Sequence, residues 1–329
     1  MPSSHETSSP QKGRLTQPLA LLIVFTAMLA VGISLLIIEP AASHLPPATP
    51  ANLTAYPAIP APSLDQADFT VTQPAQGTQK PLRYAPPSED LVLRNQLSIT
   101  QKVVFTRKDS TSTVTTALSA TALLEPNLRD PSKVFISFTD FSIRVDSNGD
   151  SVALPAVNTL LEGIRLVVVF DPVTGFEADA SLVTINPQVR RMLSLLVDVL
   201  RQAYPPLAAE NVAPGSHWQR EGQWKSSERG AVSTNMVQMV RYEEPDAYAR
   251  LDTTTALELD GNIGRAAIKG SGEGKVTSTL DLAHGRVTAS HGELRFEQNI
   301  HQGPEQVSQS LQLNFELQAL SPLSLEEMF

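Results

Sequence analysis

The spacing of apolar residues changes along the chain, and residues 19–38 show the strongest pattern, an uninterrupted apolar run without a charged residue. An α-helix rises about 1.5 Å per residue, so this run would span about 30 Å, the thickness of the hydrocarbon core of a bilayer. Lys12 and Arg14 precede the run, whereas residues 39–79 contain neither Lys nor Arg. The positive-inside rule then predicts a single-pass transmembrane helix at 19–38, a cytoplasmic tail at 1–18 and a main domain outside the cytoplasm, in the periplasm or at the cell surface. The alternative is a cleaved signal peptide, whose apolar region usually has about 7–15 residues.

The pattern between residues 88 and 320 is typical of β-strands, except for one helical stretch. Short runs of alternating apolar and polar residues are separated by turn residues. Residues 164–170 are almost continuously apolar, which favours a strand covered on both faces. Asn148-Gly149 is a strong hairpin signal, and we interpret the glycine-rich segment 270–274 as a loose hairpin. We therefore expect a mainly β (α+β) domain at 88–320, built on a large antiparallel curled sheet or half-barrel.

The helical stretch lies at residues 187–203. Asn186 is a favourable N-cap, Pro187 suits the first helical position, and the prolines at 205 and 206 end the helix. An apolar stripe at helical spacing consists of Val189, Leu193, Leu196 and Leu200. Because further apolar residues lie off this stripe, we expect one apolar helix, buried over most of its circumference and packed on the concave face of the sheet.

Two turns share one pattern, in which an Asp follows a strand and a Gly precedes the next strand. The segments are FDPVTG, with Asp171 and Gly175, and LDLAHG, with Asp281 and Gly285. An Asp carboxylate accepts hydrogen bonds from turn N–H groups, and Gly adopts the positive φ that such a turn needs. Both segments are predicted to be tight hairpins.

Composition sets the remaining boundaries. Residues 39–87 hold 11 of the chain's 25 prolines, which favours an extended, disordered linker over a helix or a central strand. Residues 321–329 show no strong pattern and are predicted to be a tail. The absence of Cys excludes disulfides, thiol catalysis and Cys-based metal sites. The net charge of −9 argues against a nucleic-acid partner.

Candidates for chemistry are few. Asp146, Asn148 and Asp150 have the spacing of calcium ligands, but Ser151 and Val157 stand where an EF-hand-like loop needs Gly and Glu. These residues are therefore interpreted as a hairpin turn. The six histidines are isolated, and nucleotide-binding and nucleophile motifs are absent. We expect no catalytic residues, no metal and no cofactor, hence a protein that is not an enzyme.

Trp218 and Trp224 are the only two tryptophans. Anchors in the core are favoured, because large aromatic side chains dominate burial. A platform for a ligand is the alternative.

The strand order, the FDPVTG and LDLAHG hairpins and the single apolar helix at 187–203 resemble bacterial envelope proteins of the lipoprotein-carrier type (LolA/LppX-like). The resemblance covers residues 88–320. It implies a half-open barrel with a helix over its concave face and an apolar cavity between them. This chain departs from that family because a transmembrane span replaces a lipid-anchoring Cys or a simple signal peptide. The layout is also similar to that of uncharacterised exported bacterial proteins, which implies no activity.

These observations leave two main hypotheses and a minor third, an unrecognised hydrolase. The first is a membrane-tethered, non-enzymatic extracytoplasmic protein that binds a lipid or another apolar ligand between sheet and helix. The predicted lining of that cavity is Val167, Val169, Leu193, Leu196 and Leu200. The second is a scaffold or interaction protein of an envelope complex, with a solid core and a protein partner. A carrier needs an apolar cavity above about 300 Å³, whereas a scaffold core is close-packed.

Overall fold

The computed structural model describes residues 69–72, 74, 77–108, 110–147, 150–153, 164–176, 187–226, 232–245, 247–263, 266–302 and 305–324. The predicted cytoplasmic tail at 1–18 and the predicted transmembrane helix at 19–38 lie outside these ranges. Within them, no helix has both the length and the hydropathy needed to cross a membrane.

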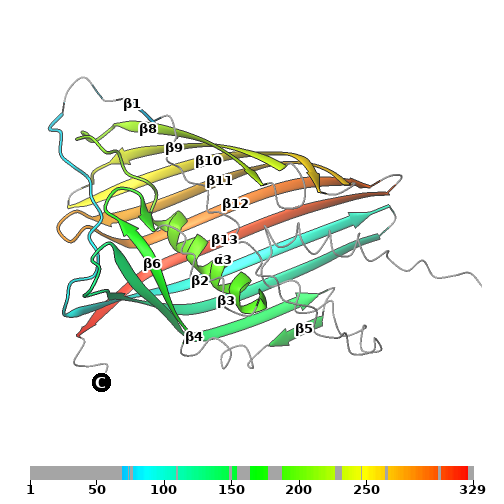
Figure 1. Cartoon of the computed structure of the whole chain (residues 1–329), viewed down its shortest axis with the longest axis horizontal. Coiled ribbons are helices and arrows are strands. Elements are labelled where there is room, and N and C mark those ends of the chain that lie inside the picture. Colours follow the sequence, from blue (N-terminus) through cyan, green and yellow to red (C-terminus); the bar gives the residue numbers. More distant parts are fainter. Residues whose placement is uncertain are drawn as a thin grey trace, which may run out of the picture.

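The described residues form one antiparallel sheet of 13 strands and one helix, as Figure 1 shows. The strands are β1 (Phe69–Thr72), β2 (Leu91–Arg107), β3 (Ser110–Pro126), β4 (Lys133–Ser147), β5 (Asp150–Ala153), β6 (Arg165–Asp171), β7 (Gly175–Phe176), β8 (His217–Ser226), β9 (Val232–Glu243), β10 (Tyr248–Ile263), β11 (Ala266–Asp281), β12 (Arg286–Gln302) and β13 (Glu305–Ser324). Their order in space is β1-β8-β9-β10-β11-β12-β13-β2-β3-β4-β6-β7, with β5 paired to β4 beside this path. The sheet is open, since its path runs from β1 to β7 without closing. The prediction of a mainly β, antiparallel fold with one helix is confirmed.

Alternation along the strands gives the sheet two different faces. We call the face that carries the helix the inner face and the opposite face the outer face. On β2, Leu97 and Ile99 are buried on the inner face, whereas Ser98 and Thr100 are exposed on the outer face. Directly paired residues share a face, so Phe315 of β13, opposite Ile99, is buried on the inner side as well. The inner face therefore supplies the core, and the outer face is polar.

Glycines on the inner face make room for aromatic rings. Gly272 of β11 lies opposite Phe296 of β12, and a Cβ at Gly272 would be 2.5 Å from the Phe296 ring. Gly292 lies opposite Phe315 in the same way, and a Cβ there would be 2.2 Å from that ring. The interpretation of residues 270–274 as a loose hairpin is wrong, because the segment lies inside β11. A ring on the neighbouring strand covers glycines that look like loop residues in the sequence.

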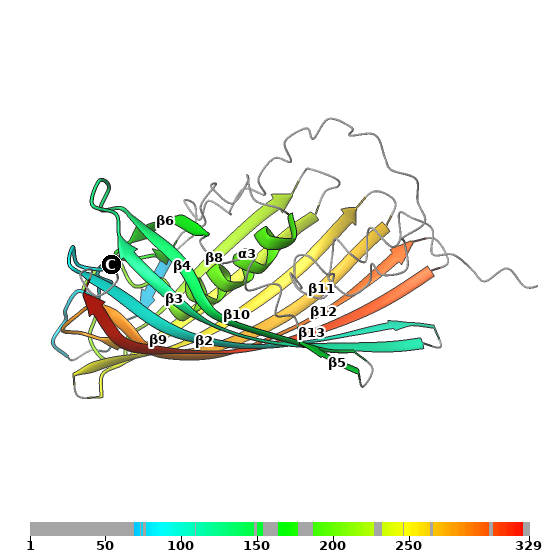
Figure 2. The ribbon, with the colours of Figure 1, turned by 90° about the horizontal axis from the view of Figure 1, so that it is seen from below.

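The helix α3 (Pro187–Ala203) begins and ends where the sequence predicts. It lies against the inner face, nearest to β11, β12 and β13. Figure 2 shows α3 inside the curve of the sheet. Side chains of α3 and of the inner face belong to one hydrophobic cluster that forms the main core.

Three side chains hold the end of α3. The Ser278 hydroxyl donates to the carbonyl of Ala203 (2.7 Å), the Tyr84 hydroxyl to that of Pro205 (2.6 Å) and the Trp218 indole N–H to that of Pro206 (2.9 Å). The last carbonyls of a helix have no partner within the helix, and a buried carbonyl without a partner is costly. Donors from β11, from β8 and from the chain before β2 therefore fix where the helix ends.

Residues 77–87, which we call the strap, belong to the folded domain. The backbone N–H of Tyr84 donates to Pro172 O (2.8 Å) and that of Ala85 donates to Gly285 O (2.7 Å), so the strap joins both predicted hairpins. Leu82 and Tyr84 are buried in the main core. The folded domain thus reaches back into the segment predicted as a disordered linker, residues 39–87, and includes β1 and the strap. The sequence did not reveal this extension of the domain, because the prolines at 74, 81, 86 and 87 are typical of a linker. Proline density does not tell whether the residues between the prolines pack against a core.

The two Asp–Gly turns form as predicted. The Asp171 carboxylate accepts the N–H groups of Val173 (2.7 Å) and Thr174 (2.8 Å), and Gly175 has a φ of 76°. In the second turn the Asp281 carboxylate accepts those of Ala283 (2.9 Å) and His284 (3.2 Å), and Gly285 has a φ of 63°. The predicted turn at 148–149 lies outside the described residues. On either side of it β4 and β5 pair antiparallel, with Ser147 opposite Asp150.

An ion pair holds the strap to β9 and its following turn. Lys80 Nζ lies 2.5 Å from a carboxylate oxygen of Glu244, and the Tyr242 hydroxyl donates to the other oxygen. Hydrogen bonds from Lys80 and Tyr242 lower the pKa of Glu244 from its ordinary value of 4.5. The charged carboxylate therefore favours the folded state.

Replacing Ser278 by Ala should lower the free energy of unfolding by about 1–3 kcal/mol, since the buried carbonyl of Ala203 loses its side-chain donor. Urea unfolding of the full chain in detergent micelles measures this change. Ser271→Ala on the exposed outer face of the same strand is the control, with an expected change within about 0.5 kcal/mol. Equal unfolding of the two variants would contradict a role for Ser278 at the helix end.

Replacing Glu244 by Gln should lower the melting temperature at neutral pH and not in acid. A group with a lowered folded-state pKa stabilises the fold in full above its unfolded pKa, near 4.5, and this contribution is lost as the pH falls through the folded-state value. The difference in melting temperature between wild type and variant should therefore shrink to zero in acid. Glu243→Gln, at the exposed neighbouring position, is the control. A difference that stays constant across the acid range would rule out this linkage.

Candidate functional site

The three predicted site residues on α3 come together between the helix and the sheet. Leu193, Leu196 and Leu200 have exposed fractions of 1%, 0% and 0%, and all three belong to the main core cluster. Their burial agrees with the apolar stripe in the sequence, and their role as the lining of a ligand cavity stays a prediction. Their complete burial results from packing against the inner face.

The two predicted residues on β6 lie elsewhere. Val167 and Val169 are half-buried, whereas Leu166, Val168 and Phe170 alternate with them and belong to the core cluster. The register with β4 sets this parity, because the buried Ile136 and Val134 lie opposite Leu166 and Val168. The charged residues at the two ends of β6 could have indicated which face of the strand is exposed. Arg165 and Asp171 share the parity of Val167 and Val169, which places all four on the outer face.

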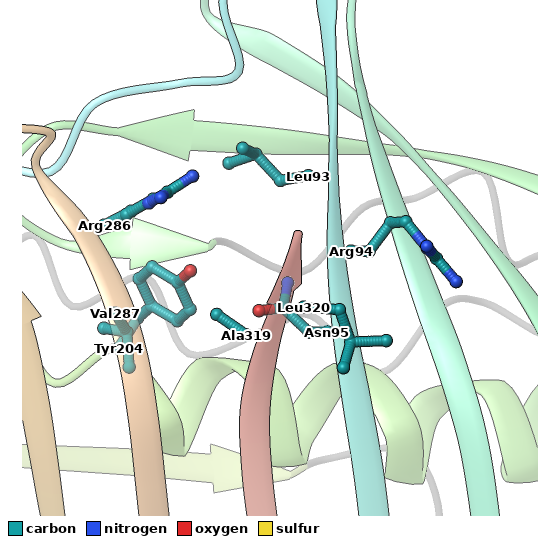
Figure 3. Close-up of a pocket in the computed structure, with 8 residues that line it drawn as sticks. All are labelled: Leu93, Arg94, Asn95, Tyr204, Arg286, Val287, Ala319 and Leu320. Atoms are coloured by element: carbon teal, nitrogen blue, oxygen red, sulfur yellow. The ribbon is translucent and has the colours of Figure 1, made fainter. Parts of the chain in front are cut away.

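The cavity nearest the end of α3 is small. Figure 3 shows the side chains around it: Leu93, Arg94, Asn95, Tyr204, Arg286, Val287, Ala319 and Leu320. Its volume is about 10 Å³, which admits no more than one water-sized particle. Small-molecule sites start at about 300 Å³. This cavity is therefore too small for a lipid or a drug-sized ligand.

Burial around this cavity also changes the chemistry of its tyrosine. Desolvation raises the pKa of Tyr204 to about 12, although a hydrogen bond from the Val287 backbone and the charge of Arg286 oppose the rise. The ring packs edge-on against Tyr84 and Phe176, at centroid distances of 5.1 and 4.9 Å. A buried, neutral tyrosine in an aromatic cluster supports a structural role at this position.

A larger hollow, of about 330 Å³, opens on the sheet at β11, β12 and β13. Its lining comprises Lys275, Thr277, His291, Gly292, Glu293, Asn314, Phe315 and Glu316. The six polar members belong to the outer face by strand parity, and they carry charges of both signs. The sequence analysis missed this hollow because these residues are spread over three strands and look like ordinary solvent-facing positions. Only the register brings them together.

Hydrogen bonds hold two of the polar lining side chains, Glu293 and Thr277. A carboxylate oxygen of Glu293 accepts from Arg295 Nε (2.7 Å) and from Gln312 Nε2 (3.1 Å). The Thr277 hydroxyl donates to the Asp252 carboxylate (2.6 Å). The hollow therefore presents a polar surface on which two side chains are held in place.

Metal-binding and aromatic candidates can also be placed. Within the described residues, no group of three His, Cys, Asp or Glu side chains is arranged to hold a metal ion. His284 hydrogen-bonds to the Asp281 carboxylate (2.8 Å) in the second Asp–Gly turn. Trp218 is a core anchor, with its ring buried and its N–H bonded to Pro206 O. The side chain of Trp224 lies outside the described part of the structure.

Comparisons with known proteins do not assign the chain to a family. No protein-family model matches the sequence, and no curated protein matches it. Among solved structures, an outer membrane channel from Pseudomonas putida F1 aligns at 7% identity and a TM-score of 0.26, over 76% of this chain and all of the other. OccK5 (OpdH) from Pseudomonas aeruginosa aligns at 6% identity and a TM-score of 0.20, over 72% of this chain and all of the other. Alignments at such TM-scores carry no argument about this chain.

Replacing Leu196 by Ala should lower the free energy of unfolding by about 2–5 kcal/mol, because a filled core cannot collapse fully around the lost side chain. Leu195→Ala on the same helix is the control, and its half-buried side chain should cost less. Chemical unfolding of the full chain measures both. A loss at Leu196 no larger than that at Leu195 would contradict a filled helix–sheet junction.

Proposed function

We propose that the chain is a membrane-tethered, non-enzymatic interaction protein of the cell envelope, a scaffold whose outer face contacts a protein partner. The hollow on β11, β12 and β13 is the centre of that contact surface. This is the second of the two hypotheses that the sequence leaves open. The location rests on the sequence pattern at residues 19–38 and on the positive residues before it.

The observation that carries the proposal is the contrast between the two faces of the sheet. On the inner face Leu193, Leu196 and Leu200 are completely buried, and the cavity at the end of α3 has about 10 Å³. On the outer face a hollow of about 330 Å³ is lined mainly by polar side chains, of which Glu293 and Thr277 are held by hydrogen bonds. Polar groups that are fixed before binding lose little conformational entropy when a partner docks.

Binding of a lipid or another apolar ligand is the competing function, and the resemblance to lipoprotein carriers favours it. That function needs an apolar space between α3 and the sheet, lined by residues such as Leu196. The packing of the three leucines argues against such a space at this junction. A filled junction still serves a scaffold, which needs only a stable framework beneath its contact surface.

Site-specific photo-cross-linking in intact cells tests the proposal. A photoreactive residue at His291, exposed within the hollow, should give one discrete cross-linked protein species with the full chain. The control carries the same group at Glu297, which is exposed on the same strand and the same face but outside the hollow. The control should give no such species.

Two results would overturn the proposal. One is the absence of a cross-linked protein at His291 when the chain is expressed and folded. The other is stoichiometric lipid that co-purifies with the wild type and is lost in Leu196→Ala, because this would place a ligand at the junction that the proposal treats as filled.

A further inference from the structure

Two charged side chains that line the outer-face hollow have no charged partner within the chain. Lys275 on β11 and Glu316 on β13 are exposed and lie on either side of β12. Among the described residues, neither takes part in an ion pair or a side-chain hydrogen bond. Glu293, which lies directly opposite Lys275, is already bonded to Arg295 (2.7 Å). The hollow therefore offers one positive and one negative charge to a partner.

The strand register sets the separation of these two charges. Lys275 lies opposite Glu293 of β12, Glu293 lies opposite Asn314 of β13, and Glu316 is two residues further along β13. Neighbouring strands are about 4.8 Å apart and each residue advances about 3.4 Å, so the two backbone positions are about 12 Å apart. Because the two charges have opposite signs, a partner must meet them with two different groups at about this spacing.

An exposed apolar pair lies beside the hollow. Val237 and Met239 on β9 have exposed fractions of 40% and 42%, and they point to the same face because they are two residues apart. Met239 lies opposite Thr254 of β10, which lies opposite Lys275. Only β10 therefore separates the apolar pair from the strand that carries Lys275, as the order of β9 to β13 in Figure 1 shows.

These groups give the outer face a direction. From β9 to β13 the exposed features follow one another as apolar, positive and negative. A partner that presents an apolar, an acidic and a basic side chain in the same order meets all three. In the reverse orientation its acidic group would meet Glu316 and its basic group Lys275, and repulsion between like charges opposes this arrangement.

We propose that the contact surface binds a protein partner in a single orientation. The partner places an apolar side chain over Val237 and Met239, an acidic side chain at Lys275 and a basic side chain at Glu316. This inference rests on the proposed function, and it names the chemistry that the partner must carry. The apolar pair supplies area to bury, and the two charges fix the direction of docking.

Photo-cross-linking at His291 of the full chain in intact cells measures this docking. Exchanging the two charges, Lys275→Glu together with Glu316→Lys, keeps the net charge and reverses their order. The cross-linked fraction should therefore fall by about tenfold or more. The control exchanges two exposed outer-face charges outside the hollow, Lys102→Glu together with Glu258→Lys, and should cross-link like the parent chain.

Met239→Ser tests the apolar end of the surface with the same cross-linker. The cross-linked fraction should fall by about 3–10-fold, because the exposed part of the Met239 side chain is no longer buried by the partner. Tyr248→Ser is the control. It removes a side chain of similar exposure (45%) at the start of β10, away from Met239 and the hollow, and should leave the cross-linked fraction unchanged.

The outcomes separate this inference from the proposed function. Absence of a cross-linked protein in the parent chain overturns the contact surface and this inference with it. A parent chain that cross-links, together with a charge-exchanged variant or a Met239→Ser variant that cross-links equally, leaves the contact surface in place and overturns the inferred orientation. If the charge-exchanged variant does not fold, Lys275→Gln and Glu316→Gln decide. Each should lower cross-linking, and an unchanged fraction in both overturns the inference.

Discussion

The arrangement of this domain depends on the hydrogen bonds that hold the end of α3. Ser278, Tyr84 and Trp218 come from parts of the chain far apart in sequence, and their donors meet the carbonyls of three backbone positions at the helix end, 203, 205 and 206. Buried carbonyls at a helix end must find partners. Because these partners belong to the sheet and to the strap, the helix, the strap and the inner face have to be in place together.

The two faces of the sheet differ in burial, since the inner face packs in the core and the outer face is exposed. Apolar side chains of the inner face pack with α3 in the main core or form two smaller clusters. Glycines at 272 and 292 on this face make room for the rings of Phe296 and Phe315. The outer face does not contribute to this core. Around its hollow, the side chains of Thr277 and Glu293 form hydrogen bonds. The proposed scaffold function is compatible with this division, since a contact surface separate from the core can vary without disturbing the fold.

Local signals in the sequence predicted local structure well. The helix at 187–203 and the Asp171 and Asp281 turns need only a capping residue, a period and a glycine at the right distance, and all three formed as predicted. Sequence patterns gave wrong predictions where a strand distant in sequence determines the burial of a residue. The glycines at 270–274 look like a loop until Phe296 covers them, and the parity of Val167 and Val169 depended on which residues of β4 lie opposite.

The sequence by itself determined a mainly β domain, an amphipathic periodicity on each strand and one helix of defined length, because these follow from interactions between residues close in the chain. It also indicated that Leu193, Leu196 and Leu200 share the apolar side of that helix. Only the tertiary structure decided that these leucines are buried in the main core, that the strap belongs to the domain, and that a polar hollow forms on the outer face. Each of these features is formed by residues that are remote in sequence, and strand register and packing, which the alternation pattern does not specify, bring them together.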